Sequence, residues 1–131
     1  MARTKLTKEY TVTKEMLAAR MGSGSLPVLA TPAVVALFEG AAAELAADYL
    51  EEGRTTVGTR IDVRHTAPTP CGAKLTVEAE LTAREGRVFR FRLAARDETG
   101  PVASAEHERV SVNAAHFAQK AQARRKAADE G

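Results

Sequence analysis

TPAVVALFEGAAAELAADYL, at residues 31–50, is the stretch that decides the fold of this chain. It predicts one long helix, because Thr31 can cap its first turn, Pro32 suits the first helical position, and small or apolar residues fill the remainder. Apolar residues occupy almost every side of this helix and leave no wide polar stripe. We therefore expect a helix that other elements largely cover, rather than one that lies on the surface.

Glu39 interrupts the apolar run of the predicted helix. An ionised carboxylate is costly to bury unless it is paired or protonated. One interpretation is that Glu39 performs acid–base or nucleophilic work in a buried site. The other is that Glu39 faces outward near the rim of the helix, which is the commoner place for a lone helical glutamate.

A second chemically active residue, His65, stands near the end of TTVGTRIDVRHT at residues 55–66. Alternation with period two predicts a strand. Its two predicted faces are Val57, Thr59, Ile61, Val63 and His65 on one side, and Gly58, Arg60, Asp62 and Arg64 on the other. A histidine on an apolar face is more often a hydrogen-bonded core residue than a catalyst. Here the nearby helical carboxylate and hydroxyl favour a proton-exchanging role.

Three further alternating segments predict an antiparallel meander. The apolar faces of the first two are Leu75, Val77, Ala79 and Leu81, then Phe89, Phe91, Leu93 and Ala95. REGR at residues 84–87 and DETG at residues 97–100 predict the turns between strands. The last strand, residues 101–113, has two apolar phases, so its inward face stays open and a bulge can divide it. A strand at residues 5–12 and a helical fragment at residues 14–20, capped by Thr13, precede the long helix.

Composition fits one domain over residues 1–131, with a core at residues 5–112 and a C-terminal helix or tail at residues 114–131. The chain has 44% hydrophobic and 27% charged residues, which is ordinary for a globular protein. A net charge of +2 and 5% aromatic residues argue against a nucleic-acid partner. Cys71 has no second cysteine to pair with, and the N-terminus lacks an apolar segment, so we expect a cytoplasmic protein without membrane contact.

Two segments have roles that the sequence leaves open. Residues 21–30, MGSGSLPVLA, form either a simple connector or a lid over a substrate. The tail carries a basic cluster of Lys120, Arg124, Arg125 and Lys126. Such a cluster belongs to a solvated helix or helps to hold a phosphate-bearing ligand.

A strand, one long apolar helix and an antiparallel meander resemble the hot dog fold. Within that fold, the motifs ATPAVVALFE, VGTRIDVRHTAPTPCG and EHERVSV resemble the fluoroacetyl-CoA thioesterase-like branch over residues 26–112. Each motif is weak alone, whereas the three in this order are specific. The resemblance implies an α+β fold in which an antiparallel sheet wraps around one long central helix.

The resemblance also implies an activity and a set of residues: hydrolysis of an acyl-CoA thioester to free acid and CoA, with no cofactor. Thr31, Glu39 and His65 match the family's catalytic residues, and Gly58 and Arg109 match residues that line the same pocket. A homodimer, or a higher oligomer, with acyl-CoA sites at the subunit interface is implied as well. The fluoroacetyl enzyme has an aromatic lid before its helix, but residues 20–30 here hold no Phe, Tyr or Trp. We therefore expect a short-chain or small acyl group rather than selectivity for fluoroacetate.

The side chains are suited to this chemistry. The chain has no GxSxG elbow, which leaves Glu39 to attack directly or to act as a base on water. The helix start at Thr31 offers N–H groups and a hydroxyl to the carbonyl oxygen, and His65 can exchange protons near neutral pH. The histidines show no ligand spacing, so we expect no metal.

Chain lengths indicate where these residues meet. The helix rises ~17 Å from Glu39 to Leu50, and a strand from Thr56 to His65 covers ~30 Å. A strand that returns along the helix therefore passes Glu39 and ends near Thr31. Unless the strand crosses obliquely, one chain does not bring His65 to its own Glu39.

Two other functions stay open at this point. A hydratase or dehydratase of the same fold would add or remove water at carbon in an acyl thioester. A non-catalytic acyl-CoA binding protein would bind tightly without turnover. Release of free thiol separates both from a thioesterase.

Overall fold

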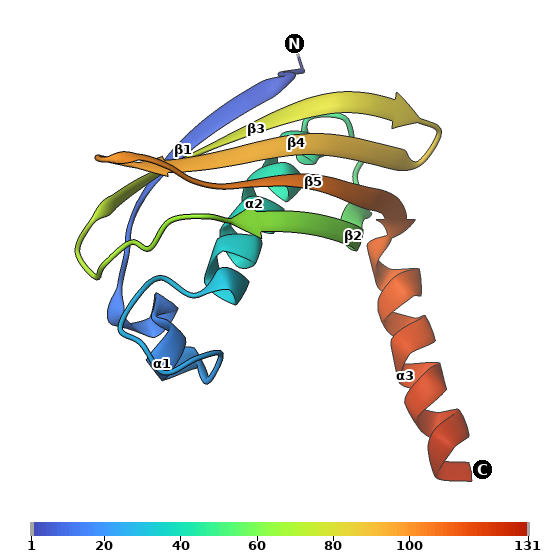
Figure 1. Cartoon of the computed structure of the whole chain (residues 1–131). Coiled ribbons are helices and arrows are strands. Elements are labelled where there is room, and N and C mark those ends of the chain that lie inside the picture. The colour runs from blue at the N-terminus through green and yellow to red at the C-terminus, as the bar shows by residue number, and fades with distance from the viewer. Residues whose placement is uncertain (1, 131) are drawn as a thin grey trace.

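The computed structural model describes residues 2–130 and shows a five-stranded antiparallel sheet with one long helix on one face (Figure 1). The elements are β1 (Lys5–Thr11), the 3-10 helix η1 (Lys14–Met16), α1 (Ala18–Met21), α2 (Thr31–Ala47), β2 (Arg54–His65), β3 (Lys74–Glu85), β4 (Val88–Asp97), β5 (Gly100–Asn113) and α3 (Ala114–Glu130). Met1 and Gly131, the ends of the predicted domain, lie outside the described residues. The arrangement is the α+β architecture that the sequence predicts.

The strands are ordered β1-β3-β4-β5-β2, and each neighbouring pair is antiparallel. β2 is therefore an edge strand that pairs with β5 alone in the described chain, from Arg54 opposite Asn113 to His65 opposite Ala103. It is 12 residues long. A long edge strand leaves a row of backbone N–H and C=O groups that another chain can pair with.

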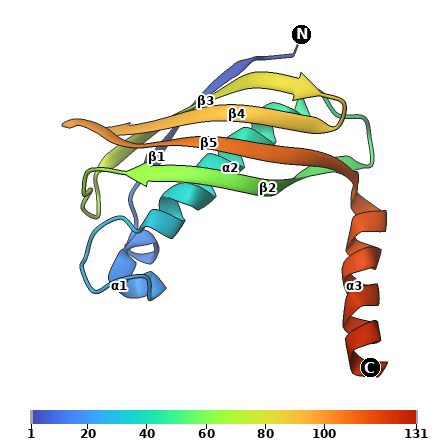
Figure 2. The same ribbon diagram turned by 45° about the vertical axis from the view of Figure 1, so that its right-hand side comes forward.

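The core lies between α2 and the sheet, which curves over the helix (Figure 2). The helix buries Ala33, Val34, Phe38, Ala41, Ala42, Leu45 and Ala46. The predicted inward faces of β3 and β4 are confirmed, because Leu75, Val77, Phe89 and Leu93 are at most 1% exposed. Burial of one such large side chain stabilises the fold by ~1.5–3 kcal/mol.

The side of α2 that faces away from the sheet is only partly covered, so the prediction of a largely covered helix holds in the single chain for the side that faces the sheet. We call this side the outer stripe of α2. It consists of Pro32, Val35, Ala36, Gly40, Ala43 and Ala47, all exposed or half-buried. The residues recur at helical spacing, and most are small and apolar. The helix has two apolar sides, of which the sheet covers one.

A β-bulge in β2 changes the faces that simple alternation predicts. Gly58 pairs with Arg109 and Arg60 pairs with Glu108, which leaves Thr59 as an extra residue. Before the bulge Thr56 faces α2 and is 6% exposed. After the bulge Ile61, Val63 and His65 face inward. The prediction that Val57 and Thr59 share the face of His65 is therefore wrong, because one extra residue reverses the alternation.

The bulge that the sequence allowed in the last strand is present in β5. Ala95 pairs with Ala103, but Arg96 pairs with Pro101, so Val102 is the extra residue. Both Val102 and Ala103 are buried as a result. Beyond this point the inward face is Ala103, Ala105, His107, Arg109 and Ser111.

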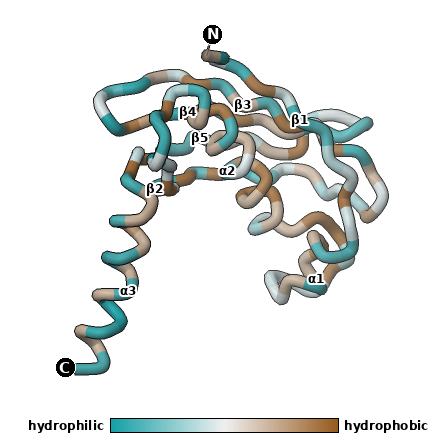
Figure 3. Tube along the Cα trace, turned by 180° about the vertical axis from the view of Figure 1, so that it is seen from behind, coloured by the Kyte–Doolittle hydropathy of each residue, from teal (hydrophilic) through white to brown (hydrophobic). Residues whose placement is uncertain are grey.

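Two further helical segments flank the sheet: one between β1 and α2, which adds Leu17 to the core, and one at the C-terminal end. Residues 14–21 form η1 and α1, and Thr13 holds the N-cap position of η1 without the predicted side-chain cap. α3 projects away from the sheet, is exposed along its whole length, and is mostly hydrophilic (Figure 3). None of the helices within residues 2–130 has the length and apolar character needed to cross a membrane.

Asp97 ties the loop after β2 to the turn between β4 and β5. Its carboxylate accepts hydrogen bonds from the N–H and the hydroxyl of Thr99 and from the hydroxyl of Thr69, which is fully buried. The N–H of Thr99 contributes most to a lowered pKa of Asp97. The loop follows directly after His65. The hydrogen bond between Thr69 and Asp97 therefore helps to hold the end of β2 in place.

We expect Asp97→Asn to destabilise the fold at neutral pH and to weaken its acid dependence. A carboxyl group whose pKa is lowered by folding stabilises the native state above its ordinary value of about 4, and this contribution disappears as the pH falls through the native value. The measurement is urea unfolding of both proteins at neutral pH and near pH 3. Asp129→Asn on the exposed α3 is the control and should follow the wild type. An unchanged slope of stability against pH in Asp97→Asn would contradict the prediction.

Candidate active site

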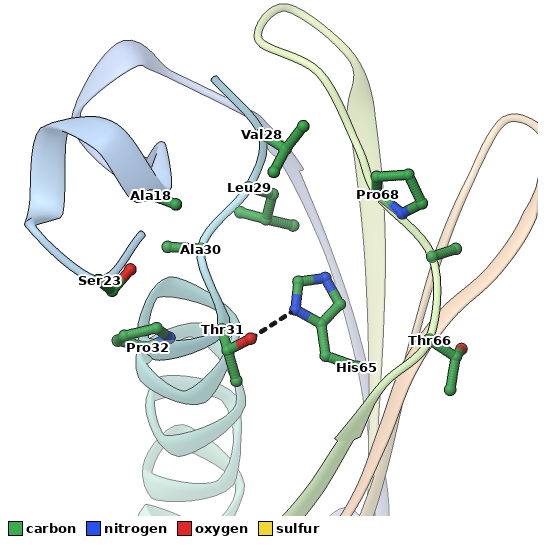
Figure 4. A pocket seen from close by; sticks show the side chains of 11 residues that line it. Ala18, Ser23, Val28, Leu29, Ala30, Thr31, Pro32, His65, Thr66 and Pro68 are labelled. Carbon is green, nitrogen blue, oxygen red and sulfur yellow. Dashed lines mark hydrogen bonds between the residues drawn. The ribbon is translucent and has the colours of Figure 1, made fainter. Parts of the chain in front are cut away.

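Thr31 and His65 meet at one end of the helix (Figure 4). Thr31 is the first residue of α2 and His65 is the last of β2; the Thr31 Oγ1 and the His65 Nδ1 are 2.9 Å apart. The strand therefore ends near the level of Thr31, as the chain lengths predict. The N-cap position belongs to Ala30, and no side chain caps the helix, so the prediction that Thr31 is the cap is wrong. Its hydroxyl contacts the imidazole instead.

The other ring nitrogen of His65, Nε2, is buried and has no hydrogen-bond partner among the described residues. Beside this imidazole lies a cavity of about 320 Å³. The side chains that line the cavity are mostly small and apolar: Ala18, Ser23, Val28, Leu29, Ala30, Thr31, Pro32, His65, Thr66, Ala67 and Pro68. Part of segment 21–30 thus forms one wall of the cavity, held by β-bridges from Leu29 to Leu17 and from Val28 to Pro70. An uncharged group of modest size fits such a lining.

Glu39 lies two turns further along α2, where the helix faces Gly58 of β2. A Cβ atom added at Gly58 would lie 2.6 Å from Glu39 Oε2 and 3.2 Å from His107 Cε1. Glycine is therefore what allows the carboxylate to approach the strand so closely. The Glu39 side chain is 43% exposed, so the single chain does not desolvate it. Its position matches the interpretation that places it near the rim of the helix, yet it points at the strand that carries His65.

Arg109 of β5 supplies the positive charge beside Glu39. Its Nη1 is 3.7 Å from Glu39 Oε2, and only 9% of its side chain is exposed. Its Nε and Nη2 donate to the hydroxyl and the carbonyl oxygen of Thr56 at 2.8 and 2.9 Å. Burial lowers the pKa of Arg109, which Glu39 opposes, but a guanidinium stays charged at neutral pH.

Sequence reasoning missed two residues that contact Arg109, namely Thr56 and His107. The Nε2 of His107 lies 3.2 Å from Arg109 Nη1. The signal for His107 was its position two residues before Arg109, which places both on one face of β5. Thr56 gave no such signal. Simple alternation places it on the face opposite His65, and the bulge that brings both residues to the inward face is not visible in the sequence.

The predicted site residues thus form two groups within one chain: Thr31 with His65, and Glu39 with Gly58 and Arg109. From Thr31 to Glu39 the helix rises ~12 Å, and from Gly58 to His65 the strand extends ~20 Å. Among residues 2–130, no hydrogen bond or ion pair links His65 to Glu39. The chain on its own brings together two parts of the predicted triad.

The fold is that of the hot dog thioesterases. A thioesterase superfamily member from Thermus thermophilus superposes with a TM-score of 0.89 at 25% identity, covering 100% of this chain and 97% of that one. The solved structure of the fluoroacetyl-CoA thioesterase FlK superposes with a TM-score of 0.86 at 33% identity, covering 93% and 95% of the two chains. These matches confirm the predicted hot dog fold.

Sequence comparison gives the family within this class. The family model described as fluoroacetyl-CoA-specific thioesterase matches residues 12–115. The fluoroacetyl-CoA thioesterase of Streptantibioticus cattleyicolor is 42% identical over 93 residues, which are 71% of this chain and 67% of that protein. The chain belongs to the fluoroacetyl-CoA-specific thioesterase family, and is a thioester hydrolase.

Proposed function

We propose that this protein hydrolyses a short-chain or small acyl-CoA thioester to free acid and CoA. The supporting observation is the Thr31–His65 pair beside a cavity of about 320 Å³ in a chain of this family. FlK variants with a substituted threonine have been solved in complex with fluoroacetate, a small acid, and with acetyl-CoA, a thioester with a small acyl group. Because residues 20–30 lack an aromatic side chain, the acyl group is not restricted to fluoroacetyl.

Each residue has a role that its chemistry supports. Glu39 either attacks the thioester carbonyl carbon directly, forming a mixed anhydride that water then hydrolyses, or acts as a base that takes a proton from an attacking water. The hydroxyl of Thr31 and the N–H groups at the start of α2 stabilise the developing oxyanion. His65 passes a proton to the departing thiolate sulfur. Gly58 leaves room for the substrate next to Glu39, and Arg109 holds positive charge there.

The active protein in this proposal is a homodimer that pairs two β2 strands in antiparallel fashion. Two features support it: the free 12-residue edge of β2, and the outer stripe of α2, whose small apolar residues suit an interface. A two-fold axis midway between Gly58 and His65 along β2 would bring His65 of one chain beside Glu39 of the other. The two groups would then combine into two complete sites.

Two wider expectations stay predictions. One is that residues 1–131 form a single domain to which α3 is appended; the other is that the protein acts in the cytoplasm.

The direct test is a thiol-release assay with the purified protein over acetyl-, propionyl-, butyryl-, branched and aromatic acyl-CoAs. We expect kcat/KM to be greatest for a small acyl group. Tight binding without thiol release would indicate a binding protein, and hydration without thiol release would indicate a hydratase. Either outcome would overturn the proposal.

We expect His65→Ala to flatten the pH dependence of kcat/KM around neutrality as well as to lower the rate. The physical reason is that an imidazole is the side chain that ordinarily exchanges protons in this range. The measurement is a pH–rate profile of wild type and variant. His116→Ala on the exposed α3 is the matched control. A lower rate with an unchanged profile would reassign His65 to a structural role.

A further inference from the structure

His107 is a buried titratable residue that the proposed mechanism does not use. It lies on the inward face of β5, is 4% exposed, and packs its ring 6.1 Å from that of Phe91. An apolar residue would fill this space without the cost of burying an imidazole. The polar contacts of the ring therefore need an explanation.

These contacts define its protonation. Nδ1 lies 2.7 Å from the carbonyl oxygen of Arg60, and a carbonyl oxygen only accepts, so Nδ1 carries the hydrogen. Nε2 lies 3.2 Å from Arg109 Nη1, and a guanidinium only donates, so Nε2 accepts. A doubly protonated ring would place two donors against each other. Burial lowers the pKa of His107, and the charge of Arg109 lowers it further, although the hydrogen bond to the Arg60 carbonyl opposes both effects. The lowered pKa agrees with a neutral ring.

The contact with His107 completes the anchoring of Arg109. Thr56 holds Nε and Nη2, at 2.8 and 2.9 Å. Nη1 has two N–H bonds and two neighbours, His107 Nε2 at 3.2 Å and Glu39 Oε2 at 3.7 Å. The acceptor on His107 thus holds one N–H of Nη1, while the carboxylate of Glu39 lies at ion-pair distance from the same nitrogen.

We propose that His107 is a positioning residue that, as a neutral acceptor, holds the guanidinium of Arg109 against Glu39 and beside the open space over Gly58. The inference rests on the proposed function, because it assigns His107 to the reaction through Arg109. In this role His107 acts through Arg109 and transfers neither a proton nor the acyl group. The same space is bounded by Glu39 Oε2, His107 Cε1 and Arg109 Nη1, each within 3.4 Å of a Cβ placed on Gly58, so a small displacement of Arg109 alters it.

Two amide substitutions separate positioning from packing. In His107→Gln the side-chain oxygen reaches the place of Nε2 and can accept from Arg109. In His107→Asn the shorter amide can donate to the Arg60 carbonyl but does not reach Arg109. We expect kcat to fall ~10- to 100-fold in the Asn variant and less than ~3-fold in the Gln variant, with little change in KM. Equal losses of kcat in the two variants, after correction for folded fraction by thermal melts, would overturn the proposal.

A double-mutant cycle tests whether His107 acts through Arg109. In an Arg109→Gln background the acceptor has no guanidinium to hold, so His107→Asn should cause no further loss of kcat. The same fold loss in both backgrounds would show that His107 acts independently and would contradict the inference. His116→Gln on the exposed α3 serves as the control and should leave kcat unchanged in both.

Nitrogen NMR of the wild-type imidazole keeps the inference testable apart from turnover. We expect the Nδ1–H tautomer from about pH 6 to about pH 8, with an Nε2 resonance that moves in Arg109→Gln. A protonated Nε2 in this range would overturn the inference even if the enzyme is active. Absence of thiol release from every acyl-CoA would instead refute the proposed function and, with it, any role of His107 in the reaction.

Discussion

Glu39→Gln should lower thioester hydrolysis by ~10²-fold or more and leave the fold intact. The amide has nearly the shape of the carboxylate but neither attacks a carbonyl nor takes a proton from water. Glu39 is 43% exposed, so the loss of its charge should cost little stability. The measurement is kcat for thiol release, together with a thermal melt of each protein.

Glu44→Gln is the matched control for this variant. Glu44 lies on the same helix, is exposed, and pairs with Lys8 at 2.9 Å, away from the candidate site. Its substitution should leave hydrolysis unchanged. Wild-type turnover in a folded Glu39→Gln protein would remove Glu39 from the mechanism.

Mixing two inactive variants, Glu39→Gln and His65→Ala, should restore about a quarter of the wild-type activity after subunit exchange. Half of the dimers in an equal mixture contain one chain of each kind. In such a dimer, one of the two sites takes an intact glutamate from one chain and an intact histidine from the other. The measurement is thiol release from the mixture against each variant alone.

A second mixture gives the control for this experiment. Thr31 and His65 contact each other within one chain, so a mixture of Thr31→Ala and His65→Ala breaks the same half of the site in both chains. It should show no recovery. Recovery in neither mixture would indicate a site within one chain, and a monomer by light scattering would remove the dimer from the proposal.

The sequence predicted the parts of the fold that local patterning controls. The alternating apolar residues of β3 and β4 are buried as expected apart from the half-buried Leu81, and the long helix begins at Thr31. These predictions held because a period of two or of 3.6 residues places side chains on faces whatever the partner. The candidates Glu39 and His65 stood out for the same reason, since each is a polar residue on an apolar face.

The bulge at Thr59 shows where local patterning ends. An extra residue in β2 is defined only by its pairing with β5, so nothing in residues 55–66 alone reveals it. Its consequence is that Thr56 and Gly58, instead of Val57 and Thr59, face α2 beside Arg109. The second group of the site, with Thr56 and His107, exists because two strands pair in this register.

What the sequence by itself determined is the order of elements, the inward faces of the regular strands, and the identity of Thr31, Glu39 and His65 as reactive groups. Chain lengths also predicted that His65 ends near Thr31. Only the tertiary structure decided that the two side chains are in contact, that Glu39 instead faces Gly58 and Arg109, and that the outer stripe of α2 is left uncovered. The physical reason is that helical and strand periodicity are local, whereas the contact between a helix and a strand depends on how far each extends and on what packs against it.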